Sequence, residues 1–178
     1  VNVPVNSSYV LACGGTQTYI TDDKIVVESV WNESTQQAQI ASGGGFSQRI
    51  AEQQYQSATS QEYIKKFPEF EPYYLSGRRG IPDIAANAAD ASGYTIFFEG
   101  RWIKVGGTSL ATPLWAALIA RMNQNLGYRL GFINPYLYKL INSSSFNQIL
   151  EGNNNLYLAA EGWNPCTGLG TPNGKELM

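Results

Sequence analysis

The chain has 178 residues, of which 43% are hydrophobic and 15% are charged, and its formal net charge is −2. This length and composition predict one domain with a substantial core, and the charge balance argues against nucleic acid as a partner. No apolar run approaches the ~20 residues that a membrane-spanning helix needs, so we expect no membrane span.

Four short segments rich in β-branched and aromatic residues predict strands. They are residues 10–13, 25–31, 94–98 and 102–105. Residues 48–66 predict a surface helix with a partly apolar face that ends before Pro68. Because strands alternate with helices, the pattern predicts an α/β layered fold with a mainly parallel sheet.

Two further helices are predicted in the second half of the chain. Residues 112–126 are nearly apolar through Leu118, which predicts a central, buried helix. Residues 132–141 predict a short helix.

The most informative motif is the sequence GTSLATP at residues 107–113. It predicts that Ser109 lies at the start of a helix, after two glycines, with Pro113 just inside the first turn. Unpaired N–H groups and the positive end of the helix dipole then lie beside the hydroxyl and favour negative charge there. The motif indicates a nucleophile for acyl transfer, whose own N–H group also binds the oxyanion.

A serine hydroxyl is a weak nucleophile without a neighbouring base, and the chain contains no histidine. Three alternatives follow. The base is a carboxylate, or it lies on a polypeptide outside this chain, or Ser109 only begins a helix and is not catalytic. The seven-residue motif with its apolar helix favours a catalytic serine.

The GTSLATP motif is similar to the nucleophile motif of subtilisin-like peptidases, and its context resembles the sedolisin family of serine-carboxyl peptidases. The resemblance runs almost end to end through six short motifs in the family's order. They are PVNSSYVLACGGT at 4–16, SGGGFS at 42–47, GR at 77–78 with PDIAA at 82–86, GTSLATP at 107–113, GFINP at 131–135 with LY at 137–138, and GWNP at 162–165 with TGLGTP at 167–172. Each motif is short, but six in one order are specific.

The resemblance implies a subtilisin-like layered fold, of which residues 1–178 form the C-terminal portion. In the family, a glutamate base, its aspartate partner and an aspartate that serves the oxyanion all precede the segment matched here. We therefore expect a separate N-terminal chain of the same precursor to supply these carboxyl groups, as in a two-chain member of the family.

With those groups, the resemblance implies an acid-active peptidase that hydrolyses peptide or protein substrates through an acyl-enzyme on Ser109. The expected location is a lysosome or other acidic vesicle, or the cell exterior. Two alternatives stay open: a non-catalytic peptide-binding fragment or pseudoenzyme, and half of a histidine-dependent subtilisin.

Several residues are expected close to the substrate. Gly107 and Thr108 directly precede the nucleophile, and bare glycine backbone can approach a ligand closely. Asp83 is the acidic residue inside a family motif, and we expect a structural role because the family's catalytic acids lie upstream. The glycines expected to form a wall of the site, with a tight turn as the alternative, are Gly43, Gly44 and Gly45.

The family binds calcium near its C-terminus through two aspartates and several main-chain carbonyls. Here the matching side chains are the neutral amides Gln148 and Asn164. Calcium affinity rises with the number of carboxylates, so we expect no calcium and no other cofactor, although Glu151 and Glu161 lie near enough in sequence to compensate. We expect an amide hydrogen-bond network to hold this loop. The remaining positions of the family's site are Ile149, Ala160 and Gly162.

Three glycosylation sequons begin at Asn6, Asn32 and Asn142. In a secretory protein these asparagines can carry glycans, provided that they lie at the surface. They modestly favour a secreted or vesicular location.

The two cysteines, Cys13 and Cys166, are far apart in sequence and fit no metal-binding spacing. Cys13 lies in an apolar segment, where a buried free thiol is the expected state. A disulfide, between the two or to a partner chain, is the alternative.

Overall fold

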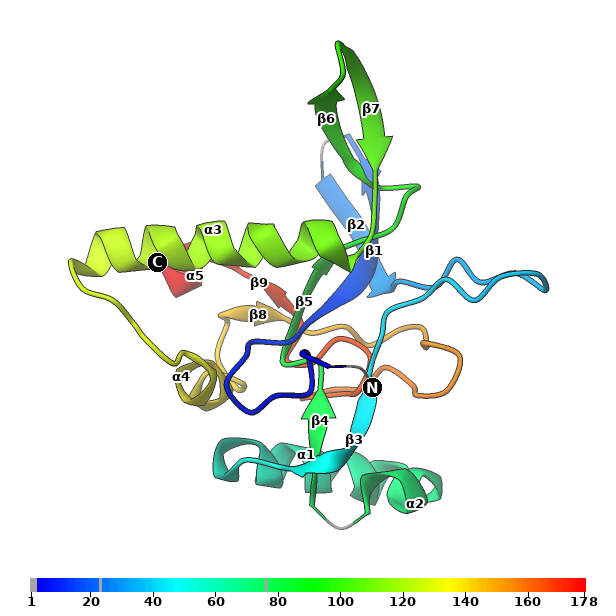
Figure 1. Cartoon of the computed structure of the whole chain (residues 1–178), viewed down its shortest axis with the longest axis vertical. Coiled ribbons are helices and arrows are strands. Elements are labelled where there is room, and N and C mark those ends of the chain that lie inside the picture. Colours follow the sequence, from blue (N-terminus) through cyan, green and yellow to red (C-terminus); the bar gives the residue numbers. More distant parts are fainter. Residues whose placement is uncertain (1–2, 23, 76) are drawn as a thin grey trace.

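The computed structural model describes residues 3–22, 24–75 and 77–178. A long helix, α3, lies across a small twisted sheet, and a β-hairpin stands away from the body at one end (Figure 1). The elements, in chain order, are β1 (Cys13–Thr21), β2 (Lys24–Val30), β3 (Gly45–Ala51), α1 (Gln54–Lys66), a 3₁₀ turn (Pro68–Phe70), α2 (Glu71–Tyr74), β4 (Arg78–Ile81), β5 (Ile84–Asn87), β6 (Tyr94–Phe98), β7 (Arg101–Val105), α3 (Thr108–Leu126), α4 (Asn134–Lys139), β8 (Phe146–Asn147), β9 (Thr171–Pro172) and α5 (Gly174–Leu177).

The central sheet has the strand order β2-β1-β5. β1 pairs with β2 in an antiparallel hairpin and with β5 in parallel. Because parallel neighbours need a long crossover, the chain travels through β3, α1 and β4 before it returns as β5. The remaining described pairs, β3–β4, β6–β7 and β8–β9, are antiparallel.

Most of the predicted elements are present. The segments predicted as strands at 25–31, 94–98 and 102–105 correspond to β2, β6 and β7, and the helix predicted within 132–141 is α4. The strand predicted at 10–13 is wrong, because β1 begins only at Cys13. Side chains bind part of the backbone of the preceding residues: the N–H of Ala12 donates to Asp83 Oδ2, and Val10 O accepts from Arg79. The carbonyl of Ala12 accepts the N–H of Ile84 at the start of β5, so regular pairing with that strand begins only at Cys13.

The helix predicted over residues 48–66 is correct only in its second part. Residues 45–51 form β3, and α1 begins at Gln54. Gly45 and Phe46 pair with Ile81 and Gly80 of β4, so a partner distant in sequence decides the structure of a segment whose local spacing is helical.

The start of α3 also differs from the prediction. The helix begins at Thr108, four residues early, so Pro113 is its sixth residue and does not lie in the first turn. Proline has no N–H group, and the carbonyl of Ser109 therefore lacks the usual i+4 helical donor. The side chain of Thr112 donates to the carbonyl of Thr108 at 2.8 Å, which satisfies one acceptor of this first turn.

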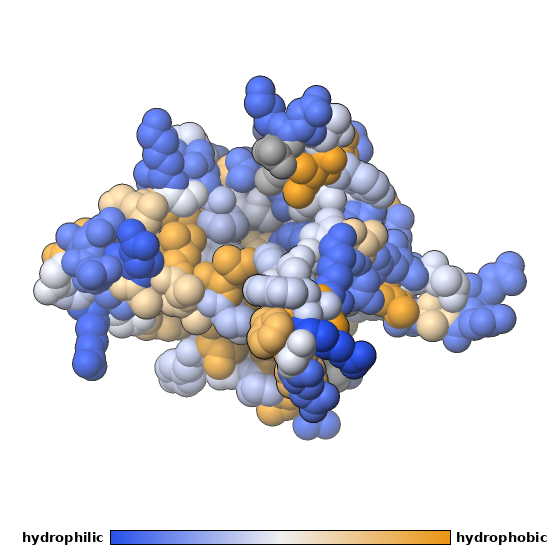
Figure 2. Space-filling view, turned by 90° about the horizontal axis from the view of Figure 1, so that it is seen from above, coloured by the Kyte–Doolittle hydropathy of each residue, from blue (hydrophilic) through white to orange (hydrophobic). Residues whose placement is uncertain are grey.

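The prediction that α3 is buried holds for one face only. Ala111, Trp115 and Met122 are buried. The opposite face is exposed although it is apolar, and Leu114 and Leu126 retain 45% and 44% of their accessible surface. Figure 2 shows the resulting tan and orange surface along α3. None of the helices within the described ranges is both long and apolar enough to cross a membrane.

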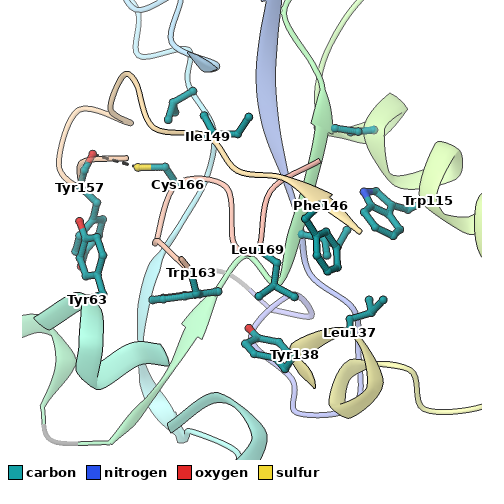
Figure 3. Packing of buried hydrophobic residues seen from close by; sticks show 14 of the residues in the cluster. Tyr63, Trp115, Leu137, Tyr138, Phe146, Ile149, Tyr157, Trp163, Cys166 and Leu169 are labelled. Carbon is teal, nitrogen blue, oxygen red and sulfur yellow. Dashed lines mark hydrogen bonds between the residues drawn. The ribbon is translucent and has the colours of Figure 1, made fainter. Parts of the chain in front are cut away.

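A single hydrophobic core joins α3, β5 and the C-terminal segment (Figure 3). Trp115 packs near Phe146, with ring centroids 6.3 Å apart, and donates its indole N–H to Ala85 O of β5 at 2.8 Å. Trp163 donates to Pro82 O at 2.8 Å. Each indole is thereby buried with its polar atom satisfied, and the two rings attach both halves of the chain to the segment 82–85.

Candidate functional site

Ser109 is the second residue of α3, and its side chain is exposed. Gly107, which precedes the helix, has φ 102°, a backbone conformation that favours glycine. The N–H of Gly107 donates to Ala88 O at 2.5 Å and so fixes the turn to the chain that follows β5. The N–H groups of Thr108 and Ser109 open the helix without intrahelical acceptors, so an oxyanion beside Ser109 meets free donors and the positive helix end.

The carboxylate of Glu33 holds the segment 90–91, against which Gly106 packs before Ser109. Glu33 accepts hydrogen bonds from the N–H groups of Asp90 and Ala91 and from the indole of Trp31. Although partial burial opposes its ionisation, these hydrogen bonds lower the pKa of Glu33 below its ordinary value. A β-carbon on Gly106 would lie 2.8 Å from the backbone nitrogen of Asp90, so only glycine fits this approach.

Within the part of the chain that the structure describes, Ser109 has no hydrogen-bonded base. Among the described residues, no side chain or backbone group makes a hydrogen bond with its hydroxyl. A serine nucleophile needs such a partner, so a nucleophilic role for Ser109 would require a group from outside the described residues.

A cleft of about 420 Å³ lies at Thr108, the residue directly before Ser109. The described side chains at its surface are small or apolar and carry no charge. This size and lining suit one side chain or a short extended stretch of a peptide. The cleft is lined by Val5, Cys13, Gly43, Gly44, Ile81, Pro82 and Thr108.

The structure brings three of the predicted substrate-proximal residues together, because Gly43, Gly44 and Thr108 line this one cleft. Gly43 is exposed, and a β-carbon there would have nothing within 4 Å. Gly45 lies elsewhere: it is buried with φ 127°, and a β-carbon on it would be 2.7 Å from the ring of Tyr157. The role of these residues toward a substrate stays a prediction.

Sequence reasoning did not place Cys13 in this cleft. Both Cys13 and Cys166 are free, and Cys13 is half-buried where it lines the cleft. Burial raises the pKa of each thiol to about 12, so both are uncharged near neutral pH. The signal available in the sequence was its position directly before Gly14 and Gly15, whose backbone approaches other groups closely.

Ser42, directly before Gly43 of the cleft, joins two segments that are distant in sequence. Its hydroxyl accepts the N–H of Gly15 at 2.9 Å and donates to Cys166 O at 2.7 Å. Gly44 lies against the carbonyl of Pro165 in the same C-terminal segment. The cleft therefore depends on contacts between segments more than 100 residues apart.

Asp83 has the structural environment that the sequence predicted. Asp83 and Arg79 form a fully buried ion pair, with Arg79 Nη2 2.7 Å from Asp83 Oδ2. The Ala12 N–H and the Tyr138 hydroxyl also donate to this carboxylate. Complete burial raises the pKa of Asp83 above its ordinary value, an effect that the neighbouring guanidinium opposes. Asp83 directly follows Pro82, which lines the cleft.

The positions that match the family's calcium site also come together. Gln148 Oε1 accepts the N–H of Gly162 at 3.0 Å, and Asn164 Nδ2 donates to Ala160 O at 3.1 Å. Ile149 is buried beside them. The predicted amide hydrogen bonds are thus present.

The three sequons differ in accessibility. Asn142 is exposed. The Asn32 amide is committed to hydrogen bonds with Asn153 and Asn155. Asn6 is only 8% exposed, so it does not meet the condition that a glycosylated asparagine lies at the surface.

Comparisons with known proteins give consistent results, although no protein-family profile matches the chain. Kumamolisin from Bacillus sp. (strain MN-32) is 43% identical over the whole chain, which spans 32% of that protein. Tripeptidyl-peptidase SED1 from Arthroderma otae is 35% identical over 98% of the chain, which spans 29% of that protein. The chain therefore covers about a third of the length of these relatives.

Among solved structures, the chain resembles Pseudomonas sedolisin, described as a serine-carboxyl proteinase complexed with two molecules of pseudo-iodotyrostatin. The TM-score is 0.83 at 32% identity, and the match covers 98% of this chain and 46% of the sedolisin chain. This likeness confirms the predicted subtilisin-like α/β fold.

Proposed function

The chain belongs to the sedolisin family, and we propose that it supplies the nucleophile of an acid-active serine-carboxyl peptidase. In this proposal Ser109 attacks the carbonyl carbon of a peptide bond, the amine leaves, and water then hydrolyses the acyl-enzyme. The observation that carries the proposal is the exposed Ser109 at the start of α3, beside free backbone donors and an uncharged cleft. The Ser109 N–H is one donor to the oxyanion.

A companion N-terminal segment of the same precursor supplies the glutamate base, its aspartate partner and the aspartate that serves the oxyanion. Two observations support a companion. Ser109 has no hydrogen-bonding base among the described residues, and the chain spans less than half of the sedolisin chain that it resembles. Leu114, in the same helix as Ser109, is also exposed and could contact such a segment.

The acid requirement follows from the proposed groups. A carboxylate base has an ordinary pKa near ~4 and stays ionised in mild acid, where an imidazole would be protonated. An aspartic acid donates a hydrogen bond to the oxyanion only while it is neutral, which also requires acid. An acidic vesicle or an acidic extracellular medium is the location that fits this chemistry.

Peptide or protein is the proposed substrate. Gly43 borders the cleft as exposed backbone, so an extended peptide can lie along it without a side-chain clash. The uncharged lining favours an apolar or neutral polar substrate residue in the cleft. The glycine wall and Thr108 then position the scissile bond against Ser109.

One specific observation favours a second candidate, a non-catalytic peptide-binding module. The Ser109 hydroxyl makes no hydrogen bond with any described residue, as expected if it only occupies a helix start. Half of a histidine-dependent subtilisin is less favoured, because the similar solved structure is described as a serine-carboxyl proteinase.

Replacing Ser109 by alanine tests the proposal. In the native assembly at acid pH, Ser109→Ala should lower kcat by several orders of magnitude, since removing the serine of a serine peptidase costs on the order of 10⁶-fold. Ser57→Ala, on the surface of α1, is the matched control and should retain activity. Undiminished peptide hydrolysis by the correctly folded Ser109→Ala protein would reject the nucleophile, and peptide binding without hydrolysis by the wild type would favour the second candidate.

A further inference from the structure

The strongest feature outside the catalytic region is the closing loop, residues 148–170, where the family's calcium site lies. Asn164 organises its second half. The side-chain oxygen of Asn164 accepts hydrogen bonds from the N–H groups of Cys166 and Thr167, each at 3.0 Å, and from the Thr167 hydroxyl at 3.1 Å. The residue is completely buried, so one end of its amide is fully used within the loop.

The nitrogen of the Asn164 side chain shows why a metal ion is not needed at this position. Its nitrogen donates to Ala160 O at 3.1 Å. If an aspartate kept this orientation, its second oxygen would face the Ala160 carbonyl, and two buried acceptors would oppose each other. A cation between them would relieve that conflict. Asparagine removes the conflict by placing a donor where the cation would be needed.

Gln148 acts in the same way on the first half of the loop. Its oxygen accepts the Gly162 N–H at 3.0 Å, which leaves its nitrogen facing Ile141 O at 3.5 Å. A carboxylate at this position could accept the Gly162 N–H but would repel the carbonyl oxygen of Ile141. The amide satisfies both, with one acceptor and one donor on the same group.

A positive charge also reaches the loop from another element. Lys66, the last residue of α1, donates from Nζ to Glu161 O at 3.0 Å. Its side chain and those of Gln148 and Glu161 line one hollow of about 350 Å³ at this edge of the molecule. The ammonium group thus interacts with a main-chain carbonyl between Ala160 and Gly162, both of which match the family's calcium site.

These contacts do not fit a calcium site. The carbonyls of Ile141, Ala160 and Glu161 each accept from a side-chain nitrogen of the protein. Within the ranges that the structure describes, no three His, Cys, Asp or Glu side chains gather where they could hold a metal ion. Because calcium requires several oxygen ligands, preferably with carboxylates, the donor set present has the wrong chemistry.

We propose that the two carboxamides and the Lys66 ammonium replace calcium as the closure of this loop, which makes its stability independent of divalent cations. Asn164 satisfies the Ala160 carbonyl of the family's calcium site, and Gln148 and Lys66 satisfy the nearby carbonyls of Ile141 and Glu161. The inference is independent of any role of Ser109, because it concerns only how the loop is held.

The replacement matters because the closing loop supports the cleft. Cys166 O accepts the Ser42 hydroxyl at 2.7 Å, and the Pro165 carbonyl lies against Gly44. Gly168 and Leu169 pack on Asp83, with the Leu169 N–H donating to Asp83 O at 2.9 Å. A loop held without metal therefore keeps the cleft walls in place under chelating or strongly acidic conditions.

Thermal unfolding of the native protein that contains this chain, with EDTA or with excess CaCl₂, tests the proposal. The wild type should have the same Tm in both. Gln148→Asp with Asn164→Asp should lower the Tm in EDTA, and CaCl₂ should restore it saturably, by about 5–10 °C at a hundred times Kd. The control, Gln36→Asp with Gln37→Asp, adds two charges in an exposed loop and should show no calcium response.

Lys66→Met provides a second test if the double variant fails to fold. This change keeps the apolar stem and removes the charge, so it should lower the Tm equally in EDTA and in CaCl₂. A saturable rise of the wild-type Tm with CaCl₂ would overturn the proposal. A folded Gln148→Asp/Asn164→Asp variant with no calcium response would overturn it as well, because the amides would then not stand at cation-ligand positions.

Discussion

A methyl group added at Gly44 should destabilise the protein, whereas the same group at Gly43 should not. The two glycines are adjacent, and neither requires a positive φ, so the comparison isolates space from backbone strain. A β-carbon on Gly44 would overlap the Pro165 carbonyl oxygen and lie 3.1 Å from Ile81 O. A β-carbon on Gly43 would meet nothing within 4 Å.

The size of the stability loss in Gly44→Ala depends on which atoms the new methyl group would meet. Both obstacles at Gly44 are backbone atoms: Ile81 belongs to β4, and Pro165 precedes the carbonyl that binds Ser42. Overpacking in such a place costs about 1–3 kcal/mol, and we expect the upper end because no flexible side chain can yield. At about 2–4 °C per kcal/mol for a domain of this size, Gly44→Ala should lower the Tm by about 6–12 °C.

The control should separate stability from function. Gly43→Ala should change the free energy of unfolding by no more than about 1 kcal/mol, in the stabilising direction, because alanine reduces the freedom of the unfolded chain. Its methyl group borders the cleft, so KM for peptide substrates should rise. Calorimetry and acid-pH kinetics on both variants measure these effects. Equal Tm changes at the two positions, or an unaltered Tm for Gly44→Ala, would refute the reasoning.

Two further predictions concern buried polar groups. Arg79→Met leaves the Asp83 carboxylate buried without its counter-charge and should cost about 3–5 kcal/mol in denaturant unfolding, partly recovered by adding Asp83→Leu; a cost below about 1 kcal/mol would contradict the packing described. Because burial raises the pKa of Cys13 and Cys166 from 9.0 to about 12, their thiolate fraction at pH 8 is about 10³-fold below that of ordinary thiols. Iodoacetamide should therefore label both cysteines rapidly in denaturant and very slowly in the native protein, with immediate native labelling as the opposing result.

The elements predicted correctly from sequence are those whose structure is decided locally. β6 and β7 are short runs of aromatic and branched residues around Gly100, and they pair with each other directly. β2 pairs with the strand immediately before it. In these cases pattern and partner lie within a few residues, so local reasoning succeeds.

The predictions are wrong where a segment distant in sequence determines the local structure. Residues 48–51 have helical spacing but belong to a strand that pairs with β4. The backbone of residues 10–12 is bonded by Arg79, Asp83 and Ile84, all distant in sequence, without forming a strand. The apolar composition of α3 predicts burial on all sides, but only one face is covered within the described residues. No local pattern encodes which partner covers an apolar surface.

The candidate site could be predicted in part, because some of its residues lie together in the sequence. Ser109 and its glycines lie in one continuous motif, and the two amides that match the calcium site were visible as single substitutions. Cys13 in the cleft and Lys66 at the closing loop were not, because each reaches its place from an element far away in sequence. Such contacts depend on tertiary geometry, which composition and spacing do not determine.

The reactivity of the Ser109 oxygen tests the central claim most directly. A peptide aldehyde labelled with ¹³C at its carbonyl, added to the native assembly, forms a hemiacetal with an activated serine, which NMR detects. We predict a hemiacetal signal at acid pH that disappears in Ser109→Ala and declines as the pH rises toward neutrality. A native assembly that gives no such signal at any pH, or an equal signal from Ser109→Ala, would contradict the account.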